Sequence, residues 1–213
     1  MKKICIIMGM ENENRQEYKP IITFAILIIN VIVFFIETAT GGSENVENVL
    51  RLGGAYTPFI IEGHQWYRIL TSMFLHYGIA HIVNNSISLL AMGQYVEAYF
   101  GRVKFIIIYI ISGIAGNLLT IATELYTGSY PVSAGASGAI CGLLGAMVIL
   151  AIDKRTRKFF PVPRMIVAVI LVLLPGFGDS SINEMAHLGG FIAGFIVGLI
   201  MFALTSHEAQ DSI

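Results

Sequence analysis

Long apolar runs dominate the chain, and short polar stretches separate them. The runs cover residues 21–39, 69–95, 103–123, 134–152, 162–177 and 186–204. A helix that crosses a bilayer needs about 20 mostly apolar residues. The pattern therefore predicts six transmembrane helices in an all-α membrane protein, with one domain over residues 20–205. Residues 1–19 and 206–213 are expected to form short polar tails.

The composition agrees with a membrane protein and argues against other classes. Hydrophobic residues make up 55% of the chain and charged residues 13%, whereas soluble domains carry about 25% charged residues. A net charge of −1 without a basic block gives no indication of nucleic-acid binding. Cys5 lies in a polar tail and Cys141 in an apolar run, so no disulfide framework is indicated. His76, His81 and His187 have no accompanying thiolate or carboxylate, so we expect neither a metal site nor another cofactor.

The positive charges predict how the helices are oriented. Eleven of the 13 Lys and Arg residues lie in the N-terminal segment, at the junction of the second and third runs, or at the junction of the fourth and fifth. Cytoplasmic loops carry such an excess, so both termini are expected in the cytoplasm of a multi-pass cell-membrane protein. The fourth and sixth helices then begin at the outer face. Ser137 is expected about 9 Å below Pro131 at about 1.5 Å per residue, at a depth similar to that of His187.

Five polar residues stand inside the apolar runs, where such side chains are costly and face an interior or a water-filled cavity. They are His81, Asn84, Asn85, Ser137 and His187. In "HIVNN", spacings of three and four residues allow His81 and both asparagines to share one helix face. One interpretation is that these groups only form hydrogen bonds between helices. The other is a polar site to which three helices contribute near the outer surface.

The fourth and sixth runs also carry small residues at helical spacing, which lets two helix backbones approach closely. These are Gly138, Gly142, Gly145 and Ala146 in one run and Gly190, Gly194 and Gly198 in the other. A serine becomes a nucleophile when a base within hydrogen-bond reach accepts its proton, and His187 is the candidate base. No carboxylate is placed to orient the imidazole, so the pattern predicts a dyad. His81, Asn85 and the Ser137 backbone N–H are candidate donors to an oxyanion.

These residues resemble the motifs of the rhomboid family of intramembrane serine proteases. "GASG" resembles the GxSG nucleophile motif around Ser137, and "AHLGGFIAG" resembles the AHxGGxxxG motif around His187. "FLHYGIAHIVNN" resembles the HxxxN motif, which implies oxyanion roles for His81 and Asn85 rather than Asn84. Further similarities lie in the loop pair Tyr67–Arg68 and in "GQYVEAYFG", with Gly93, Glu97 and Gly101. The resemblance covers residues 20–205.

The resemblance implies that the protein hydrolyses a peptide bond in or near a transmembrane helix of a membrane-protein substrate. The active site would open toward the extracytoplasmic face, and membrane lipid would be the other partner. The loop "GFGDSSINE", with Gly176 and Gly178 as hinges, is expected to act as a gate. Family members often carry Tyr or Phe four residues after the serine, where this chain has Cys141, so the imidazole is expected to be held more loosely.

Two other functions fit parts of the pattern. A pseudoprotease would use the same fold to bind transmembrane helices, although such relatives typically lack the serine or the histidine. A small transporter or channel would line its pathway with the polar cluster, but the chain has no evident inverted repeat of the kind that many transporters show. The sequence indicates neither the oligomeric state nor the substrate.

Overall fold

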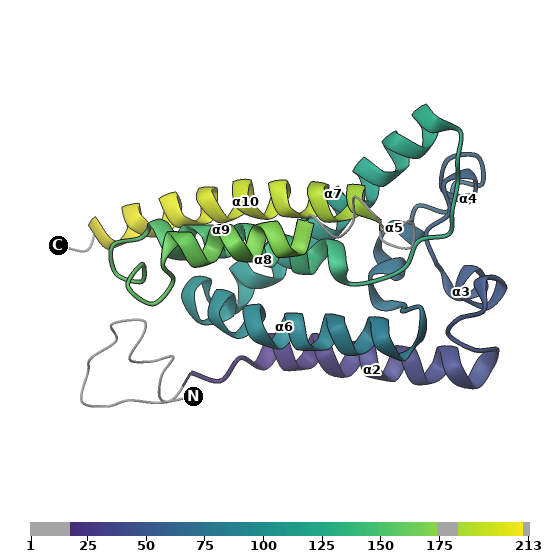
Figure 1. Ribbon diagram of the computed structural model, residues 1–213, viewed down its shortest axis with the longest axis horizontal. Helices are drawn as coiled ribbons and strands as arrows, with labels where there is room; N and C mark the ends of the chain where they lie inside the picture. The colour runs from purple at the N-terminus through teal and green to yellow at the C-terminus, as the bar shows by residue number, and fades with distance from the viewer. Residues whose placement is uncertain (1–17, 174–182, 211–213) are drawn as a thin grey trace.

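The computed structural model describes residues 18–173 and 183–210 as a bundle of α-helices (Figure 1). The long helices are α2 (Ile21–Thr40), α6 (Gly78–Phe100), α7 (Arg102–Thr127), α8 (Ser137–Ile152), α9 (Val162–Leu173) and α10 (Glu184–Gln210). Between α2 and α6 lie α3 (Val46–Leu52), α4 (Thr57–Ile61), α5 (Arg68–Thr71) and the 3-10 helix η1 (Ser72–Phe74).

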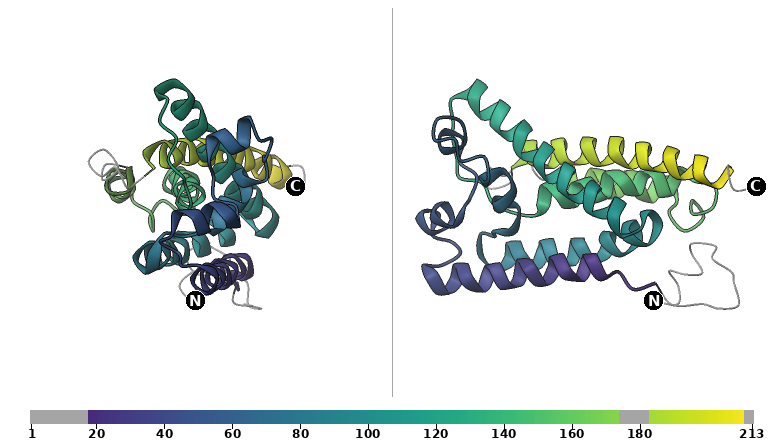
Figure 2. Two further views of the ribbon diagram at one scale, coloured as in Figure 1. Left: turned by 90° about the vertical axis from the view of Figure 1, so that its right-hand side faces the viewer. Right: turned by 180° about the vertical axis from the view of Figure 1, so that it is seen from behind.

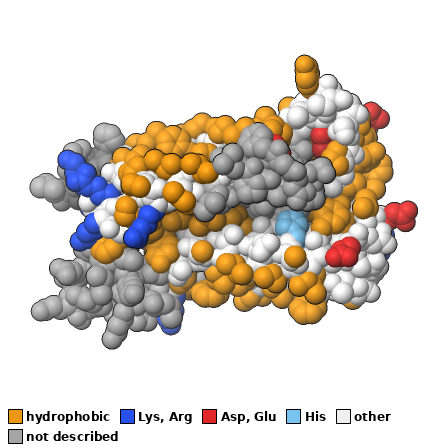
Figure 3. All heavy atoms as spheres, in the orientation of Figure 1, with side chains coloured by type: hydrophobic (Ala, Val, Ile, Leu, Met, Phe, Trp, Pro, Cys, Tyr) orange, Lys and Arg blue, Asp and Glu red, His pale blue; other side chains and the backbone are white. Residues whose placement is uncertain are grey.

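Length and composition make this an integral membrane protein. Among the described residues, three helices are long and apolar enough to cross a membrane: α2, α7 and the Glu184–Leu204 part of α10. Hydrophobic side chains cover much of the length of the molecule, and Lys and Arg gather at one end (Figure 3). An apolar surface of this extent is stable only against lipid or another protein.

The helix α8 forms the centre of the bundle. It packs against α6, α7, α9 and α10, and 13 of its 16 residues are buried. A helix that is apolar on every side is buried by neighbouring protein. Its 16 residues give a length of about 24 Å at about 1.5 Å per residue. This is less than the bilayer's hydrocarbon thickness of about 30 Å, so the helical part of this segment covers only part of that thickness.

Four long helices contact α8 directly, and α2 packs against α6. The helix α10 lies along α8, α2 lies along α6 (Figure 1), and α7 crosses the bundle obliquely (Figure 2). Glu97 of α6 joins its helix to the start of α2 by accepting hydrogen bonds from the backbone N–H groups of Ile22 and Thr23, at 3.1 and 2.8 Å, and from the Thr23 hydroxyl. Gly93 also lies against Thr23, which accounts for two positions of "GQYVEAYFG".

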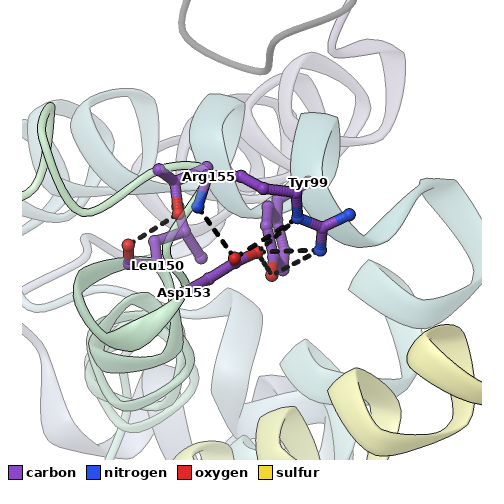
Figure 4. Close-up of polar contacts among 5 residues, drawn as sticks. Tyr99, Leu150, Asp153 and Arg155 are labelled. Atoms are coloured by element: carbon purple, nitrogen blue, oxygen red, sulfur yellow. Dashed lines mark hydrogen bonds and ion pairs between the residues drawn. The ribbon is translucent and has the colours of Figure 1, made fainter.

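A charged cluster closes the turn between α8 and α9 (Figure 4). Asp153 follows α8 and forms an ion pair of 2.8 Å with Arg155. Its carboxylate also accepts hydrogen bonds from the Arg155 backbone N–H and the Tyr99 hydroxyl. Partial burial alone would raise the pKa of Asp153, but the hydrogen bonds from Arg155 and Tyr99 outweigh it and hold this pKa below its usual range. The cluster thereby ties the end of α6 to the end of α8.

Several of the helix boundaries differ from the sequence prediction. The second helix was expected from residue 69, but α6 begins at Gly78, because the backbone is extended at Leu75 and Gly78 has φ +75°. The fourth was expected from residue 134, but α8 begins at Ser137, so the helical rise used to place Ser137 below Pro131 does not apply. The helix α10 extends beyond the expected end at residue 204. The proposed hinges Gly176 and Gly178 lie outside the described residues.

Candidate active site

Ser137 is the first residue of α8, and a non-helical segment that follows α7 leads to it. In this segment, Ser133 exchanges backbone hydrogen bonds of 2.9 and 2.8 Å with Ala55, which precedes α4, and the Gly135 N–H donates to the Ser72 carbonyl at 2.9 Å. The first N–H groups of a helix have no intrahelical acceptor, and the helix dipole makes this end positive. The N–H groups at Ser137 are therefore directed toward any negative charge that forms there.

His81 and Asn85 of α6 both lie against Gly135, two residues before Ser137. A Cβ atom at Gly135 would lie 2.8 Å from both Cε1 and Nε2 of His81, and 3.7 Å from Nδ2 of Asn85. Gly135 also has φ +139°, a conformation that residues with a Cβ rarely adopt. A glycine is therefore required at this position, because both the backbone angle and the His81 ring exclude a side chain.

The hydrogen bonds around His81 determine which ring nitrogen is a donor. The Tyr77 backbone N–H donates to His81 Nδ1 at 3.3 Å, so a neutral ring carries its proton on Nε2. That nitrogen is the one that faces Gly135. The side-chain Nδ2 of Asn85 is buried and has no hydrogen-bond partner among the described residues. Two side-chain donors thus converge next to the start of α8 with capacity for an acceptor.

His187 lies in the first turn of α10, and its helix approaches Ser137 through glycine contacts. A Cβ atom at Gly138 would lie 3.2 Å from the carbonyl oxygen of Ala186. Gly190 in turn contacts the backbone of Gly138. The neighbours of Ser137 and His187 are therefore in direct contact, and both residues are partly exposed. His187 Nδ1 is buried without a hydrogen-bond partner among the described residues.

The structure also distinguishes residues that the sequence grouped together. Asn84 is exposed, whereas Asn85 is 6% exposed and faces the site, so the two asparagines and His81 do not share one face. Cys141 is 2% exposed and free. Arg68 is buried, and its guanidinium donates to the carbonyl oxygens of Leu50 and Gly54 at 2.6 and 2.9 Å, which stabilises the connection between α2 and α6.

Sequence reasoning missed Asn183, which precedes α10. Its side-chain Oδ1 accepts a hydrogen bond of 3.0 Å from the Ala186 N–H and so caps the helix that carries His187. Its Nδ2 donates to Ser133 Oγ at 3.0 Å. The preference of Asn for helix N-caps could have indicated the first contact. No sequence signal indicates the second, because Ser133 is 50 residues away.

The site is therefore a serine at a helix start, a histidine on the adjoining helix and two nearby donors, in a membrane protein. Residues 63–204 match the family model described as the Rhomboid domain. Rhomboid protease GluP of Bacillus subtilis (strain 168) is 35% identical over 181 residues, which cover 84% of this chain and 34% of that protein. The putative rhomboid protease YdcA of the same organism is 29% identical over 208 residues, or 91% of this chain and 96% of that protein.

A plant relative gives a similar match. RHOMBOID-like protein 5 of Arabidopsis thaliana is 34% identical over 160 residues, which cover 74% of this chain and 50% of that protein. The chain belongs to the rhomboid family. It spans about a third of the length of GluP and half that of RHOMBOID-like protein 5, but nearly all of YdcA.

Proposed function

We propose that this chain is an intramembrane serine endopeptidase that uses Ser137 and His187 as a dyad. The observation that carries the proposal is the convergence at Gly135, where His81 and Asn85 meet the segment that leads into α8. The names of GluP and YdcA, both described as rhomboid proteases, give independent support. A structural role alone would not require the buried Asn85 Nδ2, which has no acceptor among the described residues, to lie beside the segment that carries a serine.

In the proposed reaction, His187 accepts the Ser137 hydroxyl proton while Oγ forms a bond to the substrate's carbonyl carbon. The C–N bond of the resulting tetrahedral intermediate then breaks, and the protonated His187 gives its proton to the leaving amine. Water, deprotonated by His187, next hydrolyses the acyl-enzyme and frees Ser137. The cycle consumes one water molecule, leaves the protein unchanged and requires no cofactor.

The tetrahedral oxyanion is stabilised by His81 Nε2–H, Asn85 Nδ2–H and the Ser137 N–H. All three are donors in the absence of substrate, so they need little reorganisation when negative charge forms. Removing one such donor typically reduces the rate by about 10²–10³-fold. Cys141 is not the nucleophile, because it is only 2% exposed and a substrate could not reach it.

The substrate is a transmembrane segment of another membrane protein. A helix protects its own carbonyl groups by hydrogen bonding, so the scissile peptide must be unwound before Ser137 can attack it. Glycine costs about 1 kcal/mol relative to alanine in a helix interior, so helix-weakening residues near the cleavage site favour the reaction. Most of the loop "GFGDSSINE", which was expected to gate this access, lies outside the described residues.

We further propose six membrane spans, α2, α6, α7, α8, α9 and α10, with both termini in the cytoplasm. The start of α2 and the end of α10 lie at the same end of the molecule (Figure 1), as an even number of spans requires. Lys and Arg gather at that end and acidic side chains at the opposite one (Figure 3), which agrees with the positive-inside rule. Ser137 and His187 are then nearer the extracytoplasmic face.

Labelling with a fluorophosphonate tests the dyad directly, because an activated serine displaces the probe's fluoride and becomes phosphonylated. Wild type, Ser137→Ala and His187→Ala are compared in detergent by intact mass. We expect one adduct on the wild type and none on either variant. A folded wild type that stays unlabelled, while a known rhomboid protease reacts under the same conditions, would favour a helix-binding pseudoprotease instead.

A further inference from the structure

Asn183 links three parts of the structure around the candidate dyad. Its side-chain Oδ1 accepts hydrogen bonds of 3.0 Å from the Ala186 N–H and from the Thr120 hydroxyl of α7. Its Nδ2 donates to Ser133 Oγ at 3.0 Å, and its backbone carbonyl accepts the His187 N–H at 3.2 Å. The orientation of the amide is determined, because the backbone N–H of Ala186 can only donate and must face the oxygen.

Ser133 is itself held firmly. It lies four residues before Ser137, and its backbone is hydrogen-bonded to Ala55 in both directions, at 2.8 and 2.9 Å. The hydrogen bond from Asn183 therefore connects the first turn of the His187 helix to a fixed point on the segment that carries Ser137. The glycine contacts between α8 and α10 set how closely the helices approach, but only the Asn183 amide joins their leading segments by a polar contact among the described residues.

We propose that Asn183 is a positioning residue, which sets the separation of His187 from Ser137 by bonding the start of α10 to Ser133. The inference rests on the proposed protease function. A shift of about 1 Å in a reacting group can cost about a hundredfold in rate. A single hydrogen bond that holds His187 in place can therefore have a large effect on the reaction rate. Asn183 does not touch the substrate in this role.

The variants that test the proposal separate this link from the other bonds of Asn183. Ser133→Ala removes the acceptor of Nδ2 and leaves the helix cap and the Thr120 contact in place. Asn183→Ala removes all the side-chain bonds. Asn183→Asp keeps the cap, and the Ser133 hydroxyl can rotate to donate to the new carboxylate. Thr120→Val is the matched control, because it also removes one hydrogen bond to Asn183 but none to the Ser137 segment.

The measurement is the concentration dependence of the fluorophosphonate labelling rate, together with Tm in the same detergent. We expect Ser133→Ala and Asn183→Ala each to lower the maximal labelling rate by about tenfold, as a displacement of a fraction of an ångström would. The half-saturating probe concentration should not change. The double variant should be no slower than Asn183→Ala, and Asn183→Asp should recover most of the rate. Thr120→Val should lower Tm without slowing labelling.

Several results would overturn the positioning role. One is a Ser133→Ala protein that is labelled as fast as wild type, and another is an Asn183→Asp protein as slow as Asn183→Ala. Hydrogen–deuterium exchange of the peptide that begins α10 gives a check without catalysis: exchange of the His187 amide must be faster in Ser133→Ala than in Thr120→Val. Equal exchange would refute the link, whereas an unreactive wild type with faster exchange would refute only the protease function.

Discussion

The contact between Gly135 and His81 allows a sharp test of the oxyanion site. In Gly135→Ala, the new Cβ would lie 2.8 Å from Cε1 and Nε2 of His81, closer than van der Waals contact. The backbone is held by the bond from the Gly135 N–H to Ser72, so the imidazole must move. We expect that the displaced ring can no longer donate its Nε2–H to the oxyanion. The labelling rate of Ser137 should then fall by about 10²-fold, the typical effect of one lost donor.

Backbone strain must be separated from this collision, because Gly135 has φ +139°. Gly128 is the matched control: it lies in the same connection between α7 and α8, has φ +72°, and a Cβ there would meet nothing within 4 Å. A residue with a Cβ in a left-handed conformation costs about 1–2 kcal/mol, and a Tm change of about 2–4 °C accompanies each kcal/mol in a chain of this size. Both alanine variants should therefore lose stability, and only Gly135→Ala should lose reactivity.

A double variant tests whether the loss acts through His81. Gly135→Ala should slow labelling strongly in the wild-type background but add little in a His81→Ala background, where no ring remains to be displaced. Equal labelling rates for Gly135→Ala and Gly128→Ala would refute the reasoning. So would a Gly135→Ala effect of the same size with and without His81.

Three further predictions concern the framework of the bundle. Glu97→Ala leaves two backbone N–H donors at the start of α2 without their acceptor, at about 1–3 kcal/mol each, so thermal unfolding in detergent should begin at a clearly lower temperature. Gly194→Val would force a side chain into the backbone of Gly142, and size-exclusion chromatography should show little folded protein, whereas Ile196→Val, at a half-exposed position on the same helix, should behave as wild type. Because the folded pKa of Asp153 is lowered, its contribution is present above the usual carboxyl pKa and is lost as the pH falls through the folded value. Asp153→Asn should therefore lower Tm at pH 7, and a Tm difference that did not shrink under acidic conditions would contradict this assignment.

The helices and their order followed from the sequence because lipid and a packed core both require long apolar runs. Each of the six expected runs overlaps one long helix of the described residues, and the first and third runs match their helices to within a few residues. The motifs around Ser137 and His187 indicated the family correctly. Each motif could be recognised from the sequence because its residues lie close together at the start of one helix, where local helix geometry alone sets their arrangement.

The sequence could not predict where α6 and α8 begin, because hydrophobicity does not distinguish a helix from an apolar segment of another shape. The residues before Ser137 are apolar enough to extend the helix. They are instead non-helical, because Ser133 and Gly135 form backbone hydrogen bonds with Ala55 and Ser72, which lie far away along the chain. Likewise, helical spacing allows either Asn84 or Asn85 of "HIVNN" to share a face with His81, and only packing against Gly135 selects Asn85.

The sequence by itself therefore determined the class of protein, the helices and the candidate nucleophile and base. Tertiary structure alone decided which nitrogen of His81 is the donor, through a backbone group of Tyr77, and joined Asn183 to Ser133 across 50 residues. The physical reason is the same in both cases. Helix formation depends on short-range periodicity, whereas the direction of a hydrogen bond depends on which distant groups the packed helices bring within about 3 Å of each other.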